Sequence, residues 1–221
     1  MTRRRRALPI VSAAAAVILV AALATASAIA RRSNEEAAPP RSLRIAVVGD
    51  DYTAGRQNRV VWPTLLAQRT GWSVSNFALP GAGYLADGAG GYAFTYQVDR
   101  ARGADPDFIL VVGGLKDTGF PEVAPINAGA IAAIHKIVLG GERPLLIGPT
   151  WYETPVPEAV SRVSDAVQSA AKSTGVPYLD ALDPPWLSPR LMQADLAYPT
   201  DEGQSLLADR VAAWVRTEVV R

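Results

Sequence analysis

RIAVVGDDYTAG, residues Arg44 to Gly55, is the stretch that decides the fold. Its first five residues are mostly apolar, as in a β-strand that is buried on both faces. Gly49 ends this run, and the residues after it are acidic, small or polar. A buried strand that enters such a loop is typical of a parallel α/β sheet, where ligands bind beyond the carboxyl ends of the strands. The stretch therefore raises the question of what Asp51 does in this loop.

Short apolar runs of this kind recur along the chain and alternate with helical patterns. The predicted strands are Arg44–Val48, Ser73–Ala78, Phe108–Val112, Leu145–Ile147 and Pro177–Leu179. The predicted helices are Val60–Thr70, Asn127–Leu139, Pro157–Thr174 and Gly203–Val220, with a turn around Gln97–Ala101. This alternation predicts a parallel sheet that is covered by helices on both faces.

The first 42 residues differ from the rest in composition. Four arginines, Arg3–Arg6, precede 24 uncharged residues that are rich in Ala, Val and Leu. A helix needs about 20 such residues to cross a bilayer, and leading arginines favour a cytoplasmic N-terminus. We therefore expect a basic cytoplasmic segment at 1–6, a transmembrane anchor at 7–30, a linker at 31–42 and one extracytoplasmic domain at 43–221. Cleavage after Ala28-Ile29-Ala30 would instead make the domain a secreted protein.

Charge and cysteine content restrict the function classes. From residue 34 onward the chain has 16 basic and 21 acidic residues. This mildly acidic domain lacks the basic surface that binds nucleic acid. The sequence contains no cysteine, which excludes disulfides, a cysteine nucleophile and thiolate metal ligands. The composition is typical of a high-GC bacterium, and with the apolar N-terminal segment it predicts a location in the bacterial cell membrane.

Three blocks stand at the ends of predicted strands and a fourth precedes the last predicted helix, in the order VVGDDYTAG, NFALPGAGY, VVGGLKDTG and DLAYPTDEG. In this order they resemble the SGNH (GDSL) hydrolases over nearly all of residues 43–221. The resemblance implies a flavodoxin-like, three-layer α/β/α sandwich. It also implies a site with a Ser nucleophile, an oxyanion hole made by a Gly and an Asn, and a His base that is oriented by an Asp.

Three of the four residues that name this family are replaced. Asp51 stands at the position of the nucleophilic Ser, Lys116 at that of the Asn and Tyr198 at that of the His. Gly81 matches the oxyanion glycine, and Asp195 matches the orienting acid. A carboxylate has no proton to lose at neutral pH, and an unperturbed tyrosine, with a pKa of about 10, is no base there. The chain is therefore predicted to lack serine esterase activity.

The altered site has two interpretations. In the first, Asp51 and Lys116 form an ion pair, and the domain is a binding or scaffolding module of the cell envelope. Its ligand would be a glycan or a lipid, and its protein partner is unidentified. In the second, Asp51, Lys116, Asp195 and Tyr198 form a non-standard site that hydrolyses carbohydrate or lipid esters. The predicted ligand contacts are Asp50, Asp51, Gly81, Tyr84, Lys116 and Trp151, because strand ends, glycines and loop aromatics suit such contacts.

Other chemistry is only weakly indicated. Four acids, Asp50, Asp51, Asp117 and Asp195, suit a hard cation, but no cluster of His or Cys supports them and no metal is expected. The single histidine, His135, falls in a predicted packing helix and is expected to be structural. The run GAGYLA, Gly81–Ala86, matches the dinucleotide fingerprint, yet it follows the second strand and no acidic residue ends the next one. No cofactor is therefore expected.

Overall fold

The computed structural model describes residues 42–219 of the 221-residue chain. Ser42–Arg221 forms one unit by itself. The predictions for the segments at 1–6 and 7–30, and for nearly all of the linker at 31–42, lie outside the described residues. They therefore stay predictions.

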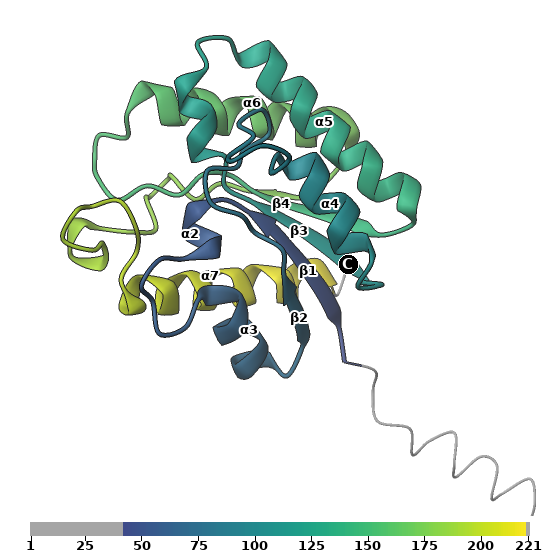
Figure 1. Cartoon of the computed structure of the whole chain (residues 1–221), viewed down its shortest axis with the longest axis horizontal. Coiled ribbons are helices and arrows are strands. Elements are labelled where there is room, and N and C mark those ends of the chain that lie inside the picture. Colours follow the sequence, from purple (N-terminus) through teal and green to yellow (C-terminus); the bar gives the residue numbers. More distant parts are fainter. Residues whose placement is uncertain (1–41, 220–221) are drawn as a thin grey trace, which may run out of the picture. The chain divides into compact units, whose positions relative to one another are not determined.

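A five-stranded parallel sheet occupies the centre of the described domain (Figure 1). Its strands are β1 (Arg44–Gly49), β2 (Ser73–Asn76), β3 (Phe108–Val112), β4 (Arg143–Ile147) and β5 (Tyr178–Leu179). Their order is β2-β1-β3-β4-β5, and every neighbouring pair is parallel. The chain order reverses between β1 and β3, which is where open α/β sheets bind their ligands. The predicted parallel sheet is confirmed.

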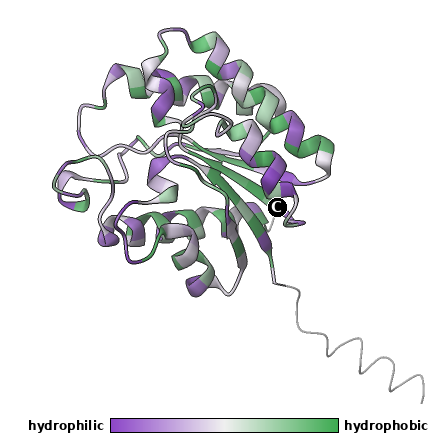
Figure 2. Ribbon diagram, viewed as in Figure 1, coloured by the Kyte–Doolittle hydropathy of each residue, from purple (hydrophilic) through white to green (hydrophobic). Residues whose placement is uncertain are grey.

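Helices cover both faces of this sheet (Figure 1). One core joins a sheet face to α4 (Phe94–Arg102), α5 (Val123–Gly140) and α6 (Glu158–Thr174). The other core joins the opposite face to α3 (Trp62–Thr70) and α7 (Asp201–Val219). Figure 2 shows the apolar strands between the two layers and polar residues along the outer sides of the helices. The predicted three-layer α/β/α sandwich is therefore confirmed.

Three helices, α4, α5 and α7, extend beyond their predicted ranges, and α7 begins two residues early, at Asp201. Only a turn was expected around Gln97, because Phe94–Arg102 is polar in composition. The buried side chain of Gln97 instead ties α4 to the end of β1: its Oε1 accepts from the amide of Gly49 at 2.9 Å, and its Nε2 donates to the Gly49 carbonyl at 3.0 Å. Helix α5 begins at Val123 and so includes Pro125. A proline in the first helical turn removes no intrahelical hydrogen bond.

Within residues 42–219, α5 is the one helix that is long and apolar enough to cross a membrane, with a mean hydropathy of 1.5 over 18 residues. This helix packs on the sheet through Ile126, Ala130, Ala133, Ile134 and Ile137. The core helix of a sandwich passes the same length and composition test. His135 lies on the exposed side of α5.

Three short helices complete the domain, and all of them lie in loops. They are α2 (Asp51–Ala54), η1 (Leu115–Gly119) and η2 (Pro189–Leu191). They were not predicted, because segments of three to five residues carry no helical periodicity. Two of them, α2 and η1, directly follow the ends of β1 and β3 and hold the residues at the candidate site.

Candidate functional site

Two buried aspartates, Asp50 and Asp117, hold the loops around the site in place. Asp50, directly after β1, is 2% exposed. Its carboxylate accepts hydrogen bonds from the amides of Tyr52 (3.2 Å), Gly114 (2.9 Å) and Leu115 (3.2 Å). A side chain at Gly113, where φ is 110°, would collide with this carboxylate. Asp50 thus ties the loop after β1 to the loop after β3. Asp50 was predicted to contact a ligand, but backbone donors surround its carboxylate, and it does not line the pocket beside Asp51.

The second buried aspartate, Asp117, holds the loop after β2. Its carboxylate accepts from the consecutive amides of Tyr84 (2.6 Å), Leu85 (2.9 Å) and Ala86 (2.9 Å). Gly83 passes so close to Asp117 that a Cβ there would lie 2.5 Å from its oxygens. From the sequence Asp117 was expected to matter only as a metal ligand, and this structural role was not predicted. The signal that could have revealed it is its place in the GGLKD block, next to Lys116.

The ionisation of Asp50 provides a test of this architecture. Burial raises the pKa of Asp50 to about 6, against the opposing effect of its backbone hydrogen bonds. In an unfolded chain an aspartate titrates near pH 4. Between about pH 6 and pH 4 the native state therefore binds a proton that the unfolded state does not. The stability that this group contributes is fully present below about pH 4 and is lost as the pH rises through about 6.

We expect the carboxyl carbon of Asp50 to titrate in NMR with a midpoint near pH 6, accompanied by a shift of the Gly114 amide proton. An Asp50→Asn variant should lack both changes. A midpoint at or below pH 4.5 would contradict the burial of this charge.

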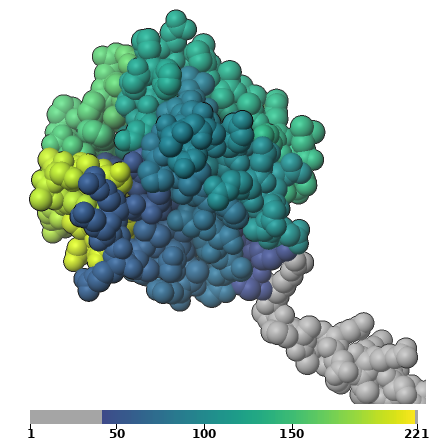
Figure 3. Space-filling view, viewed as in Figure 1, coloured from purple at the N-terminus to yellow at the C-terminus, as the bar shows by residue number. Residues whose placement is uncertain are grey.

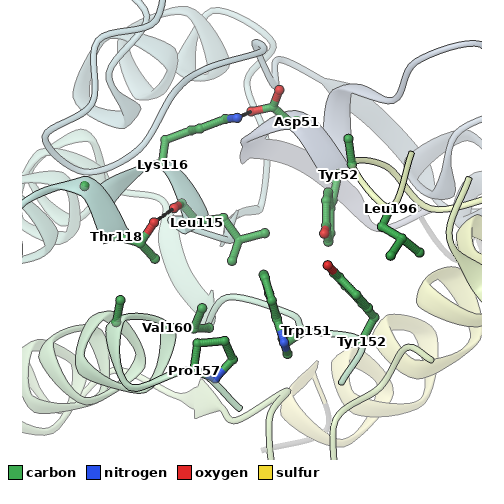
Figure 4. A pocket seen from close by; sticks show the side chains of 13 residues that line it. Asp51, Tyr52, Leu115, Lys116, Thr118, Trp151, Tyr152, Pro157, Val160 and Leu196 are labelled. Carbon is green, nitrogen blue, oxygen red and sulfur yellow. Dashed lines mark hydrogen bonds and ion pairs between the residues drawn. The ribbon is translucent and has the colours of Figure 1, made fainter. Parts of the chain in front are cut away.

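Asp51 lies at the centre of the site and begins α2. Its side chain is 9% exposed. One oxygen, Oδ1, accepts a hydrogen bond from the Tyr198 hydroxyl at 2.8 Å. The other, Oδ2, accepts from the Gly81 amide at 2.9 Å and lies 3.5 Å from Nζ of Lys116. Figure 4 shows the Lys116 side chain extending to this carboxylate. The structure thus brings together four of the residues that the sequence singled out.

Tyr198 reaches Asp51 because its loop is fastened to the segment after α2. Nδ2 of Asn58 donates to the carbonyl of Pro199 at 3.1 Å, and Nε2 of Gln193 donates to the carbonyl of Arg56 at 2.6 Å. Figure 3 shows the two segments side by side, in dark blue and yellow-green. These bonds hold together residues that are more than a hundred positions apart in the chain.

Tyr198 keeps its proton in this environment. Desolvation raises the pKa of Tyr198, and so do the hydrogen bond to Asp51 and the charge of Asp51. The guanidinium of Arg56, 5.4 Å from the centre of the ring, acts in the opposite direction. The hydroxyl therefore serves as a hydrogen-bond donor to Asp51 and does not act as a base near neutral pH.

Two predicted site residues lie elsewhere. Asp195 is exposed and accepts from the amide of Ala197 in its own loop at 3.0 Å. Within residues 42–219 no hydrogen bond or ion pair joins it to Tyr198, whose hydroxyl is directed at Asp51. Tyr84 is 3% exposed, and its ring packs edge-on against Phe94 in the core. The backbone amide of Tyr84 donates to Asp117, while the side chain of Tyr84 points into the core, away from the site.

A pocket of about 550 Å³ opens beside Asp51 and Lys116 (Figure 4). The rings of Trp151 and Tyr152 stack with their centres 4.6 Å apart and line one side. Trp151 thus lies along the pocket, and its buried Nε1 has no hydrogen-bond partner among residues 42–219. Tyr52 and Tyr152 were not predicted to contact a ligand, although each directly follows a residue that was. The other lining residues are Leu115, Thr118, Gly119, Pro157, Ala159, Val160, Leu196 and Ala197.

No group of three His, Asp or Glu residues that could hold a metal ion occurs within residues 42–219. Asp50, Asp51, Asp117 and Asp195 each accept from different donors and do not converge. The hard-cation interpretation therefore finds no support in their arrangement.

Comparison with known proteins gives consistent matches. The GDSL-like lipase/acylhydrolase family profile matches residues 47–206. A GDSL lipase of Mycobacterium tuberculosis is 26% identical over 191 residues, which cover 80% of this chain and 83% of that protein. The psychrotrophic esterase EstA of Pseudoalteromonas superimposes with a TM-score of 0.65 at 19% identity, over 80% of this chain and 98% of that one. A GDSL-like lipase of Bacteroides thetaiotaomicron gives a TM-score of 0.61 at 14% identity, over 85% and 97%. At these identities the two structures establish a shared fold.

Proposed function

The chain belongs to the GDSL-like lipase/acylhydrolase family, and from this premise we propose that its domain is a binding module that has kept the site of that family and lost serine esterase activity. One observation carries the proposal. The carboxylate of Asp51 is enclosed by the Gly81 amide, the Lys116 ammonium and the Tyr198 hydroxyl. The side chain at the nucleophile position is thus itself the acceptor of the surrounding donors.

Serine esterase chemistry needs three things at this place. It needs a hydroxyl nucleophile, a base that takes its proton, and donors that are free to bind the developing oxyanion. Residue 51 has no hydroxyl, the Tyr198 hydroxyl donates a hydrogen bond where a base would accept one, and the Gly81 amide is already bound to Asp51. Loss of a nucleophile or base alone lowers the rate by about six powers of ten in a serine protease. All three requirements fail together here.

The alternative is a hydrolase of carbohydrate or lipid esters that uses Asp51, Lys116, Asp195 and Tyr198. The contact of Asp51 and Lys116 with the 550 Å³ pocket favours it, because a substrate could reach both groups. The exposed position of Asp195, away from the other three, weighs against it.

Hydrolysis of short p-nitrophenyl esters by the full-length protein separates these functions. We expect the wild type to hydrolyse p-nitrophenyl acetate and butyrate at the buffer rate, and Asp51→Ala to behave identically. Asp165→Ala, on α6 and outside the pocket lining, serves as a matched control. Turnover that is present in the wild type and in Asp165→Ala, but absent from Asp51→Ala, would refute the binding proposal and favour the hydrolase.

We also propose that the domain is extracytoplasmic and is held at the bacterial cell membrane by residues 7–30. The uncharged run and the preceding arginines support this orientation. External protease should degrade the domain in intact spheroplasts. Protection until the membrane is lysed would contradict the proposed orientation.

A further inference from the structure

A second hollow lies on the other side of Lys116. It has a volume of about 650 Å³ and is lined by Pro80, Gly81, Ala86, Asp87, Gly88, Lys116, Gly119 and Phe120. Lys116 and Gly119 also line the aromatic pocket. The two hollows therefore adjoin at Lys116, whose ammonium pairs with Asp51 in the first of them, and together they are called the groove.

Each half of this groove offers an aromatic surface. Trp151 and Tyr152 stack on one another in the first half. Phe120, which is 40% exposed, borders the second half. Gly81 and Gly88 also line the second half, and they pack so closely that a Cβ on Gly81 would lie 3.1 Å from Cα of Gly88.

The polar groups along the groove suit an uncharged ligand. Lys116 is balanced by Asp51, and the carboxylate of Asp87 is directed at the amides of Gly91, Tyr92 and Ala93. The exposed Asp87 keeps its negative charge, and Lys116, the cation that lines both hollows, is paired with Asp51, so the groove disfavours an anionic ligand. Figure 4 shows the hydroxyls of Tyr52 and Tyr152 turned toward one another at the first pocket. Each hydroxyl can both donate and accept.

Aromatic faces, paired hydroxyls and a neutral ion pair together match the chemistry of a sugar chain, whose rings have apolar faces and hydroxyl edges. An alkyl chain fits less well, because it would have to cross the ion pair and leave charged groups without water. Resting on the proposed binding function, we propose that the groove binds a neutral oligosaccharide whose rings occupy both hollows and cross over Asp51 and Lys116.

Binding of neutral oligosaccharides of increasing length tests this proposal. The full-length protein in lipid nanodiscs is titrated calorimetrically with β-1,4-linked N-acetylglucosamine, glucose and xylose oligomers of two to six residues. In at least one series we expect the pentasaccharide to bind about tenfold more tightly than the disaccharide, because only the longer chain reaches both hollows.

Three variants assign the contacts. Phe120→Ala should weaken pentasaccharide binding up to about tenfold and leave the disaccharide unchanged, whereas Trp151→Ala should weaken both. Tyr96→Ala removes an exposed ring of α4 outside both hollows and should change neither.

The proposal is overturned if no series binds, if affinity does not grow with chain length, or if Phe120→Ala has no effect. Affinity that follows alkyl length in a series of alkyl glucosides, and not the number of sugars, would also overturn it in favour of an acyl ligand. Mass spectrometry of the recovered oligosaccharide shows whether the protein cleaves its ligand. It therefore tests the non-catalytic function separately from binding in the groove. Intact ligand supports both, whereas cleavage with unchanged length dependence contradicts only the non-catalytic role and leaves the groove supported.

Discussion

The triple variant Asp51→Ser, Lys116→Asn, Tyr198→His should hydrolyse p-nitrophenyl acetate at least about a thousandfold faster than the wild-type protein. The side chain of residue 51 already lies 2.9 Å from the Gly81 amide. A serine there removes the carboxylate, which leaves this amide free to bind an oxyanion. An asparagine at position 116 adds a second neutral donor, and a histidine at position 198 supplies the base.

Two features limit the size of this gain. A histidine side chain is shorter than the tyrosine that it replaces, so the loop that contains Tyr198 must move toward α2. Asp195 must also leave its contact with the Ala197 amide before it can orient an imidazole. We therefore expect partial recovery of the rate of an intact triad.

Controls in the same background locate the activity. Asp51→Ala combined with Lys116→Asn and Tyr198→His should be inactive, because it lacks a nucleophile. A folded triple variant that shows no turnover above this control would mean that the three loops no longer hold the catalytic geometry of the family.

Replacement of Asp117 by alanine should have the largest effect on stability. Asp117 is fully buried and accepts from three consecutive amides, those of Tyr84, Leu85 and Ala86. A buried donor that loses its partner costs about 1–3 kcal/mol. We therefore expect the free energy of unfolding to fall by about 3–5 kcal/mol, a large share of the 5–15 kcal/mol that is typical of a domain.

Urea denaturation of both proteins measures this difference, and Asp87→Ala is a matched control. Asp87 also accepts from three amides, those of Gly91, Tyr92 and Ala93, but it does so at the surface, where water can replace it. Its removal should lower the urea midpoint much less. Equal losses in the two variants would show that burial does not decide the strength of these contacts.

Much of the fold was predictable from local patterns. Runs such as Phe108–Val112 are apolar along their whole length, which only a strand between two helical layers explains. The same short-range signals located the loops at the strand ends, and the order of the four blocks predicted the family that the profile match shows. The identities of Asp51, Lys116 and Tyr198 led to the prediction of lost esterase chemistry before any geometry was known.

Side-chain directions were less predictable. Tyr84 was expected at the cleft because it follows the Gly81 block, yet its ring packs against Phe94 because the loop is turned by Asp117. Asp50 was expected to contact ligand, but it accepts from amides of the loop after β3. Each outcome depends on a partner more than ten residues away, which no local pattern specifies.

The sequence by itself therefore determined the layers, the position of the site and which side chains were replaced, because periodicity and residue chemistry are local properties. Only the tertiary structure decided that the Asp51 carboxylate takes the Gly81 amide and the Tyr198 hydroxyl, groups that lie 30 and 147 positions away in the chain. The physical reason is that parallel strands carry loops from distant parts of the chain to one edge of the sheet. The hydrogen-bond partners of a carboxylate there are set by how those loops pack.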